Sequence, residues 1–241
     1  MNRYVLLLIL VGSLLSGFLS AQEMDRSRLS SILKSLELDA ARIKEELCVE
    51  KKMPNKENRY IVVIPVLVGK AEDEYNFTVQ NYILITDEKG VIENKYLDPT
   101  ELISDAVALR PFTIDTGLYT ISTNVRAFGV KTTFVGSSRI FPYESERISM
   151  YYPEGKSLKK VLDQFEMGIN SGEWDGKCKG KFKDNHSYII VNPPKMNTFS
   201  DLTIKTVSVT TVNKEVKEDC ENKETSSTSF KTLKFTNGKY L

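Results

Sequence analysis

The sequence predicts a mainly β protein, an antiparallel meander folded as a sandwich or a degenerate propeller, with an N-terminal amphipathic helix and one short additional helix. From Phe112 onward, apolar and polar residues alternate over most segments. Gly, Pro and Asn residues typical of turns separate these segments at short intervals. Before Pro54, by contrast, apolar residues recur every three or four positions, which is the spacing of one helix face.

Residues 1–21 have the features of a secretory signal peptide. Arg3 supplies the positive charge, the apolar run Val5–Leu19 contains no charged residue, and Ser20-Ala21 places small side chains at the expected cleavage site. The run is short for a membrane-spanning helix of about 20 residues, and Gly and Ser interrupt it, which disfavours the alternative of an uncleaved anchor. We therefore expect cleavage near Ala21 and a soluble protein that is periplasmic or secreted.

The N-terminal helix is expected from Asp25 to Lys51, within a segment of residues 22–54 that ends at Met53-Pro54-Asn55. It should cover one side of a sheet, although a free-standing docking helix is an alternative. Residues 55–241 should then form a single mainly β domain. The apolar stripe of the helix comprises Leu29, Ile32, Leu33, Leu36, Ala40, Ile43 and Leu47.

Three further segments are assigned from local signals. Asp98-Pro99 predicts the cap and first turn of a short second helix that ends before Pro111. The segment SLKKVLDQF (Ser157–Phe165) fits both helical and strand spacing, and the preceding Pro-Glu-Gly-Lys turn favours a strand. The segment ENKETSSTS (Glu221–Ser229) is polar and is expected to be a loop.

The composition argues against several functions. Lys and Arg number 33 against 32 Asp and Glu, and Arg3 is the only charged residue of the predicted signal peptide, so the mature chain should be neutral. A neutral surface disfavours nucleic acid or an anionic membrane as partner. His186 is the only His, no nucleophile elbow, phosphate loop or EF-hand spacing occurs, and we predict no catalytic residue, metal or cofactor. A hydrolase that uses loop carboxylates remains an alternative.

Three Cys residues in an exported chain predict one disulfide and one free thiol. We favour the pairing of Cys178 with Cys220, because both lie in polar, turn-rich sequence of the β-rich half. Cys48 lies near the end of the predicted helix, where a thiol can pack as a small hydrophobic side chain.

The segment NSGEWDGKCKGKF (Asn170–Phe182) is the main candidate site. It contains the only Trp, two acids, three Gly and Cys178. We interpret it mainly as a tight chain reversal pinned by the disulfide, and alternatively as a binding edge that uses Glu173, Trp174 and Asp175. Aromatic residues beside turns could also face a ligand, although core packing is the alternative for them. These residues are Tyr143, Tyr151 and Tyr152.

The C-terminal half, from Val125 to Leu241, resembles a family of uncharacterised exported bacterial proteins with a Gly-Glu-Trp-Asp-x-x-Cys segment, here Gly172–Cys178. The ending FLSAQ of the signal peptide is similar to that of Bacteroidetes-type secreted proteins. TFSDLTI (Thr198–Ile204) is faintly similar to a strand of propeller-like periplasmic inhibitors and immunity proteins, but the calcium-loop acids that precede that strand are missing. Because the sequence lacks a recognisable set of catalytic residues, we expect a non-catalytic periplasmic protein that binds another exported protein, and the faint similarity implies an inhibitor-like or immunity-like role. Alternatively, it binds an envelope glycan.

Overall fold

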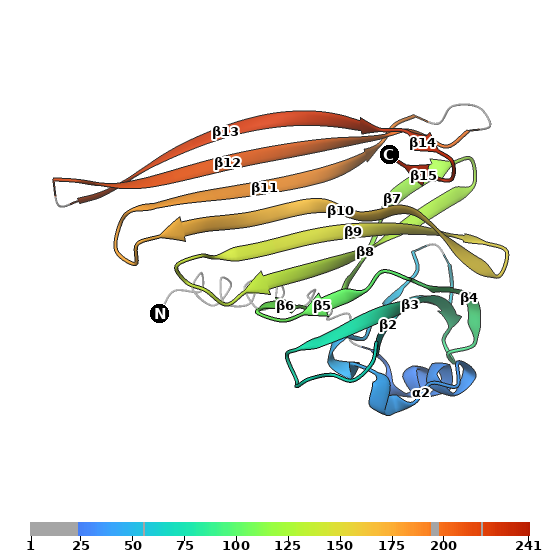
Figure 1. Cartoon of the computed structure of the whole chain (residues 1–241). Helices are drawn as coiled ribbons and strands as arrows, with labels where there is room; N and C mark the ends of the chain where they lie inside the picture. Colours follow the sequence, from blue (N-terminus) through green and yellow to red (C-terminus); the bar gives the residue numbers. More distant parts are fainter. Residues whose placement is uncertain (1–23, 55, 194–197, 218) are drawn as a thin grey trace, which may run out of the picture.

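The computed structural model describes residues 24–54, 56–193, 198–217 and 219–241, so the predicted signal peptide lies outside the described residues. The predicted mainly β class is confirmed, and the strands form one curled sheet together with a small hairpin (Figure 1). No helix in the described ranges is long and apolar enough to cross a membrane. The elements are α2 (Arg26–Ser35), β1 (Val49–Lys52), β2 (Arg59–Leu67), β3 (Phe77–Asp87), β4 (Ile92–Leu97), β5 (Leu102–Ser104), β6 (Val107–Leu109), β7 (Thr113–Ser122), β8 (Val125–Gly136), β9 (Tyr143–Glu154), β10 (Ser157–Trp174), β11 (Gly180–Val191), β12 (Leu202–Val216), β13 (Asp219–Leu233), β14 (Phe235–Thr236) and β15 (Lys239–Tyr240).

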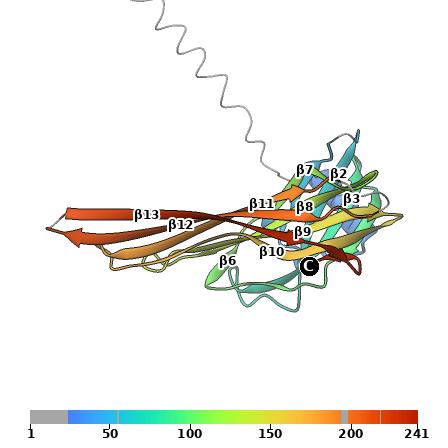
Figure 2. The ribbon, with the colours of Figure 1, turned by 90° about the horizontal axis from the view of Figure 1, so that it is seen from above.

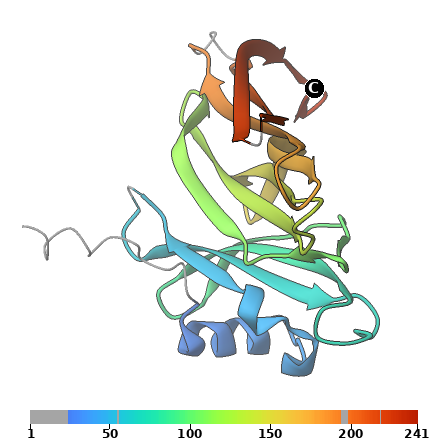
Figure 3. The same cartoon turned by 90° about the vertical axis from the view of Figure 1, so that its left-hand side faces the viewer.

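Strand β10 is the branch point of the sheet. The main strand order is β1-β2-β3-β4-β10-β11-β12-β13, and β10 also pairs with β9, which continues to β8 and β7. The start of β10 meets β4 in a parallel bridge between Ser157 and Lys95, and its end pairs with β11 in antiparallel register from Gly168 to Trp174. The sheet therefore divides at β10, which lets its N-terminal part curl against the β7–β9 part (Figure 3).

The almost continuously apolar sequence of strand β2 is explained by the burial of both of its faces. The side chains of Ile61 and Val63 belong to the cluster that packs against β7–β9, whereas those of Val62 and Ile64 belong to the cluster under helix α2. All four are fully buried. Both faces of the strand are covered, so both sets of alternating side chains must be apolar.

Helix α2 occupies only the first part of the range expected to be helical. Asp25 caps it by accepting a hydrogen bond from the Arg28 N–H at 2.8 Å. After Ser35 the chain forms two short 3₁₀ turns and then strand β1, which pairs with β2. The residues of the apolar stripe are therefore divided between two clusters. Leu29 and Ile32 of α2 pack between the helix and the sheet, whereas Leu47 packs in the cluster on the other face of the sheet.

The second predicted helix is wrong. Its residues form the short strands β5 and β6, in which Leu102 pairs with Val79 of β3 and Leu109 pairs with Phe134 of β8. The Asp98 carboxylate accepts a hydrogen bond from the Thr100 N–H at 3.1 Å, which is an Asx turn and not a helix cap. In a helix cap and in an Asx turn alike, an Asp carboxylate accepts a hydrogen bond from a nearby backbone N–H. Pairing with the distant strands β3 and β8 decides which of the two structures forms.

The polar segment Glu221–Ser229 is not a loop but part of strand β13, which pairs residue by residue with β12. The strand interpretation of Ser157–Phe165 is confirmed by β10. Asn237 and Gly238 form the turn that joins β14 to β15, with both residues at positive φ.

The distal parts of β10–β13 form a single-layered extension that we call the arm (Figures 1 and 2). It begins at the cross-strand row Gly168, His186, Val207 and Thr228. No residue of the arm, as described, is buried, because neither face is covered by another layer. The arm therefore contributes little to the core and is free to serve another purpose. It comprises residues 168–174, 180–186, 207–216 and 219–228.

Candidate functional site

The turn between β10 and β11 lies at the tip of the arm and is closed by two hydrogen bonds. The Asp175 N–H donates to the Lys179 carbonyl at 2.9 Å, and the Asp175 carboxylate accepts from the Lys177 N–H at 2.9 Å. Gly176 has φ +80°, a left-handed conformation that favours glycine. The predicted tight reversal is thus built from an Asx turn and one left-handed glycine.

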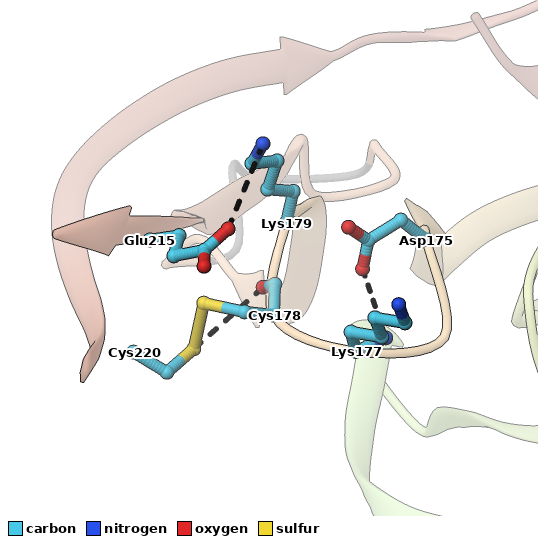
Figure 4. The surroundings of a disulfide bond; sticks show 6 residues. All are labelled: Asp175, Lys177, Cys178, Lys179, Glu215 and Cys220. Atoms are coloured by element: carbon cyan, nitrogen blue, oxygen red, sulfur yellow. Dashed lines mark hydrogen bonds and ion pairs between the residues drawn. A yellow bond between two sulfur atoms is a disulfide. The ribbon is translucent and has the colours of Figure 1, made fainter. Parts of the chain in front are cut away.

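A disulfide ties this turn to the beginning of β13 (Figure 4). The predicted pairing of Cys178 with Cys220 is confirmed, with Cα atoms 5.6 Å apart. An ion pair between Lys179 and Glu215, with 3.7 Å between Nζ and Oε2, lies beside it. Because the two cysteines come from different hairpins, the bond fixes the position of one hairpin end relative to the other.

Cys48 is the remaining thiol and is buried. Burial, together with the nearby charges of Glu45 and Glu46, raises the pKa of this thiol to about 12. We expect one reactive thiol per chain in denaturant without reductant and none in the native protein, as measured with a thiol reagent. Cys48→Ser should abolish the signal in denaturant. Three thiols in denaturant would contradict the disulfide.

The loop between β8 and β9 lies against the outer side of the β10 end. The Trp174 N–H donates to the Ile140 carbonyl at 2.9 Å, and the Gly172 N–H donates to the Pro142 carbonyl at 3.1 Å. These bonds hold Phe141 beside Trp174, with 61% of Phe141 exposed. The turn and the loop together border an open groove of about 450 Å³. Its lining residues are Phe141, Glu173, Trp174, Asp175, Lys179, Gly180 and Lys181.

Two glycines of the arm are explained by Phe182. A Cβ atom on Gly172 would lie 2.4 Å from Cδ1 of the Phe182 ring, and one on Gly180 would lie 2.9 Å from its Cε2 atom. Gly172 is the direct cross-strand partner of Phe182. The Phe182 ring therefore lies over Gly172 and Gly180, which have no side chains. This allows the ends of β10 and β11 to pack closely.

The groove has the chemistry of a recognition surface. It offers two carboxylates, from Glu173 and Asp175, two ammonium groups, and two aromatic rings. The only imidazole, that of His186, lies farther along β11, in edge contact with Tyr188 at 4.7 Å between ring centroids. No group of three or more His, Cys, Asp or Glu side chains in the described ranges is arranged to bind a metal ion. The geometry supports hydrogen bonds, ion pairs and stacking.

The structure separates the predicted aromatic residues. Tyr143 pairs with Ser171 next to the tip. Tyr151 is only 1% exposed and cannot contact a ligand at the surface, whereas Tyr152 packs against Phe199 with ring centroids 5.7 Å apart. Tyr151 lies eight positions after Tyr143 along β9, a distance of about 27 Å. The groove thus contains Glu173, Trp174 and Asp175 but not the tyrosines of the far end.

Sequence reasoning missed the loop residues Ile140 and Phe141, which are 49% and 61% exposed. The signal that could have found them is a pair of large apolar residues between Ser138 and Pro142, in a segment that reads as a turn. Exposed apolar side chains in a turn point to a contact surface.

A second polar cluster surrounds the buried side chains of Lys160 and Asp98, where the two parts of the sheet meet. Lys160 Nζ donates to Asp98 Oδ1 at 2.8 Å, to Thr100 Oγ1 at 3.0 Å, and to the Asp163 carboxylate. Tyr151 donates its hydroxyl hydrogen to Asp98 Oδ2 at 2.6 Å. All three donor positions of the ammonium group are used, so the cluster leaves none for a substrate.

The pKa values agree with a structural role for this cluster. Burial acts to raise the pKa of the Asp98 carboxyl, but the hydrogen bonds from Lys160, Tyr151 and the Thr100 N–H outweigh it, and the pKa lies below its ordinary value. Burial and the Asp98 charge raise the pKa of Tyr151 well above its ordinary value. The carboxylate is charged and the phenol is neutral at physiological pH, as the ion pair requires.

In comparisons with known proteins, no protein-family model, curated protein or solved structure matches the chain. The family resemblance of the segment around Trp174 therefore stays a prediction.

Proposed function

We propose that this protein is an exported, non-catalytic binding protein that recognises another exported protein with the tip of its arm. The observation that carries the proposal is the groove at the tip, in which the exposed Phe141 lies beside Trp174 on a turn pinned by a disulfide. Aromatic residues at the centre of a contact surface supply much of the affinity in protein interfaces.

The tip is held in place before a partner binds. The disulfide, the Asx turn at Asp175 and the backbone bonds from Trp174 and Gly172 fix its three chain segments. A surface that is ordered in advance loses less conformational entropy on binding. The disulfide also suits an oxidising compartment such as the periplasm, in keeping with the predicted signal peptide.

The charges of the groove favour a protein as the ligand. The groove is lined by the carboxylates of Glu173 and Asp175 and the ammonium groups of Lys179 and Lys181, together with two aromatic rings. A polypeptide surface offers charges of both signs together with apolar side chains, which matches this pattern. An inhibitor-like or immunity-like role, as the faint resemblance implies, is the specific form of the proposal.

The test uses the double substitution Phe141→Ala and Trp174→Ala. The protein is purified from its complete coding sequence, used to capture partners from an envelope extract, and then titrated with the captured protein. We expect the variant to bind at least about 30-fold more weakly, because each truncated anchor removes contact area at the centre of the site.

Tyr188→Ala is the matched control, since Tyr188 is exposed on β11 just outside the arm and does not line the groove. It should leave the affinity unchanged, and the melting temperatures of all variants should agree within a few degrees. Equal binding by the double variant would refute the tip as the site. Retention on polysaccharide alone, with no protein captured, would refute a protein target.

A further inference from the structure

Strand β13 leaves the longest open edge of the sheet. It runs from Asp219 to Leu233 and pairs only with β12, without a register shift. At about 3.4 Å per residue its edge is about 50 Å long. The strand contains no Pro and no bulge, the usual features that prevent a strand edge from pairing with another chain. It pairs with no other strand in the described part of the chain.

The hydrogen-bonding groups on this edge belong to the even-numbered residues. The Asn192 N–H donates to the Asp201 carbonyl at 3.0 Å, just beyond the last pair of the β11–β12 ladder, Val191 and Leu202. In an antiparallel ladder the direction of the backbone groups alternates, so even residues of β12 point toward β13. Their partners on β13 are odd-numbered, as in the pair Leu202 and Leu233. The N–H and C=O groups of Cys220 through Thr232, at every second residue, therefore face outward.

We propose that two copies of this chain associate by antiparallel pairing of their β13 edges about a two-fold axis at Ser226. Ser226 is the middle residue of the strand, so this register pairs the two strands over their whole length. It also pairs outward-facing residues with outward-facing residues, which allows about 14 backbone hydrogen bonds between the copies. The rest of each molecule lies on the β12 side of its own strand and leaves the edge open.

The charges of β13 favour this register over the one displaced by a residue toward Leu233. With the axis at Ser226, Glu221 lies opposite Lys231 of the second copy, and the symmetry repeats this pair. Both residues belong to non-hydrogen-bonded pairs, in which side chains lie closest. Moving the axis by one residue, to Ser227, would place Lys223 opposite Lys231 and replace both attractions by repulsions. Between these charged ends, residues Thr225 to Phe230 are uncharged, so they add no electrostatic repulsion between the two strands.

The pairing has a consequence for the tips. Because the strands are antiparallel, the disulfide end of one copy lies beside the Leu233 end of the other, and the two tips lie at opposite ends of one continuous sheet. Pairing of the β13 edges is independent of what the tips bind.

The first experiment measures the oligomeric state of the protein, expressed from its complete coding sequence, by sedimentation velocity at micromolar concentrations. We expect a dimer. Lys231→Glu should weaken dimerisation about 10- to 30-fold, because two attractive pairs become repulsive, and adding Glu221→Lys should restore it to within about threefold. A monomeric wild type would refute the proposal. This holds even if a strand of another protein binds the β13 edge.

The second experiment tests the edge and the register. Ser226→Pro removes an outward N–H without touching the β12 ladder and should yield a folded monomer, whereas Ser226→Ala should remain a dimer. Ser226→Cys should form a reducible dimer on mild oxidation, since residues in a hydrogen-bonded pair have Cα atoms about 5.5 Å apart. Thr228→Cys should not, because the two copies of Thr228 would be four residues apart along the strands. A dimer indifferent to Ser226→Pro, or equal cross-linking at both positions, would refute the pairing.

Discussion

Replacing Lys160 with methionine should lower the free energy of unfolding by about 3–5 kcal/mol, one of the two largest effects we expect of a single substitution. The side chains of Lys160 and Asp98 are each only 5% exposed, and methionine fills a similar volume. The variant therefore leaves the Asp98 carboxylate buried without its cation. Chemical denaturation followed by circular dichroism measures the change.

The neighbouring lysine provides the matched control. Lys159 pairs with Glu154 at 3.3 Å, but both side chains are about half exposed, so Lys159→Met should change stability by less than about 1 kcal/mol. Adding Asp98→Asn to Lys160→Met should recover part of the loss, because it removes the uncompensated charge. Losses that simply add in the double variant would contradict coupling between the two groups.

Acid should reduce the difference between wild type and Lys160→Met. The pKa of Asp98 is lowered in the folded protein, so the stability it provides is present above its unfolded pKa of about 3.9 and is lost as the pH falls through the folded value. In Lys160→Met, no ammonium group offsets the effect of burial on Asp98. The pKa of Asp98 should therefore rise, and protonation of its carboxylate should stabilise the folded state. A constant difference from pH 7 to pH 3 would contradict this assignment.

Replacing Arg28 with methionine should also destabilise the protein by about 3–5 kcal/mol. Arg28 of α2 forms an ion pair with Glu50, with side chains 7% and 11% exposed. Its guanidinium group lies 3.7 Å from the Tyr60 ring centroid and donates to the Glu88 carbonyl at 3.2 Å. These contacts join the helix to three segments of the sheet, and the substitution breaks all of them.

Two further variants separate the contributions to this effect. Arg28→Lys should recover only part of the stability, because a single ammonium group cannot stack on Tyr60 and bond both acceptors. Arg26→Met is the control, since Arg26 and Glu45 are exposed and 3.9 Å apart, and it should have no measurable effect. Hydrogen exchange should show faster opening of α2 in Arg28→Met. A loss below about 1 kcal/mol would contradict a stabilising role for the pair.

The ambiguity of β10 has a physical origin in its pairing with β9. The register between them shifts at three places, between Lys160 and Leu162, between Leu162 and Phe165, and between Glu166 and Gly168. Each irregularity breaks the alternation of faces, so apolar residues of a strand acquire spacings of three and four. The turn before Ser157 was therefore a better guide than periodicity.

Strand β13 and the short strands β5 and β6 could not be predicted for two different reasons. Both faces of β13 are exposed, so no apolar alternation marks it, and only pairing with β12 makes it a strand. β5 and β6 contain three residues each, too few for any period to show. In both cases the determining partners are other strands, which a local pattern does not encode.

The candidate site divides in the same way. Glu173, Trp174, Asp175 and the disulfide could be predicted, because a turn with Gly, Cys and the only Trp is unusual within a short stretch. Phe141 could not, since it reaches Trp174 through backbone bonds between segments that are 30 or more residues apart in the sequence.

The sequence by itself determined the mainly β class, the turn at the tip and the cysteine pairing. These follow from side-chain periodicity, turn chemistry and cysteine usage, which act over a few residues or on composition. Only the tertiary structure decided where the helix stops, which polar segment becomes the edge strand, that Tyr151 is buried against Asp98, and which side chains share the groove. Those outcomes depend on burial and backbone pairing between distant segments, whose free energies exceed local preferences.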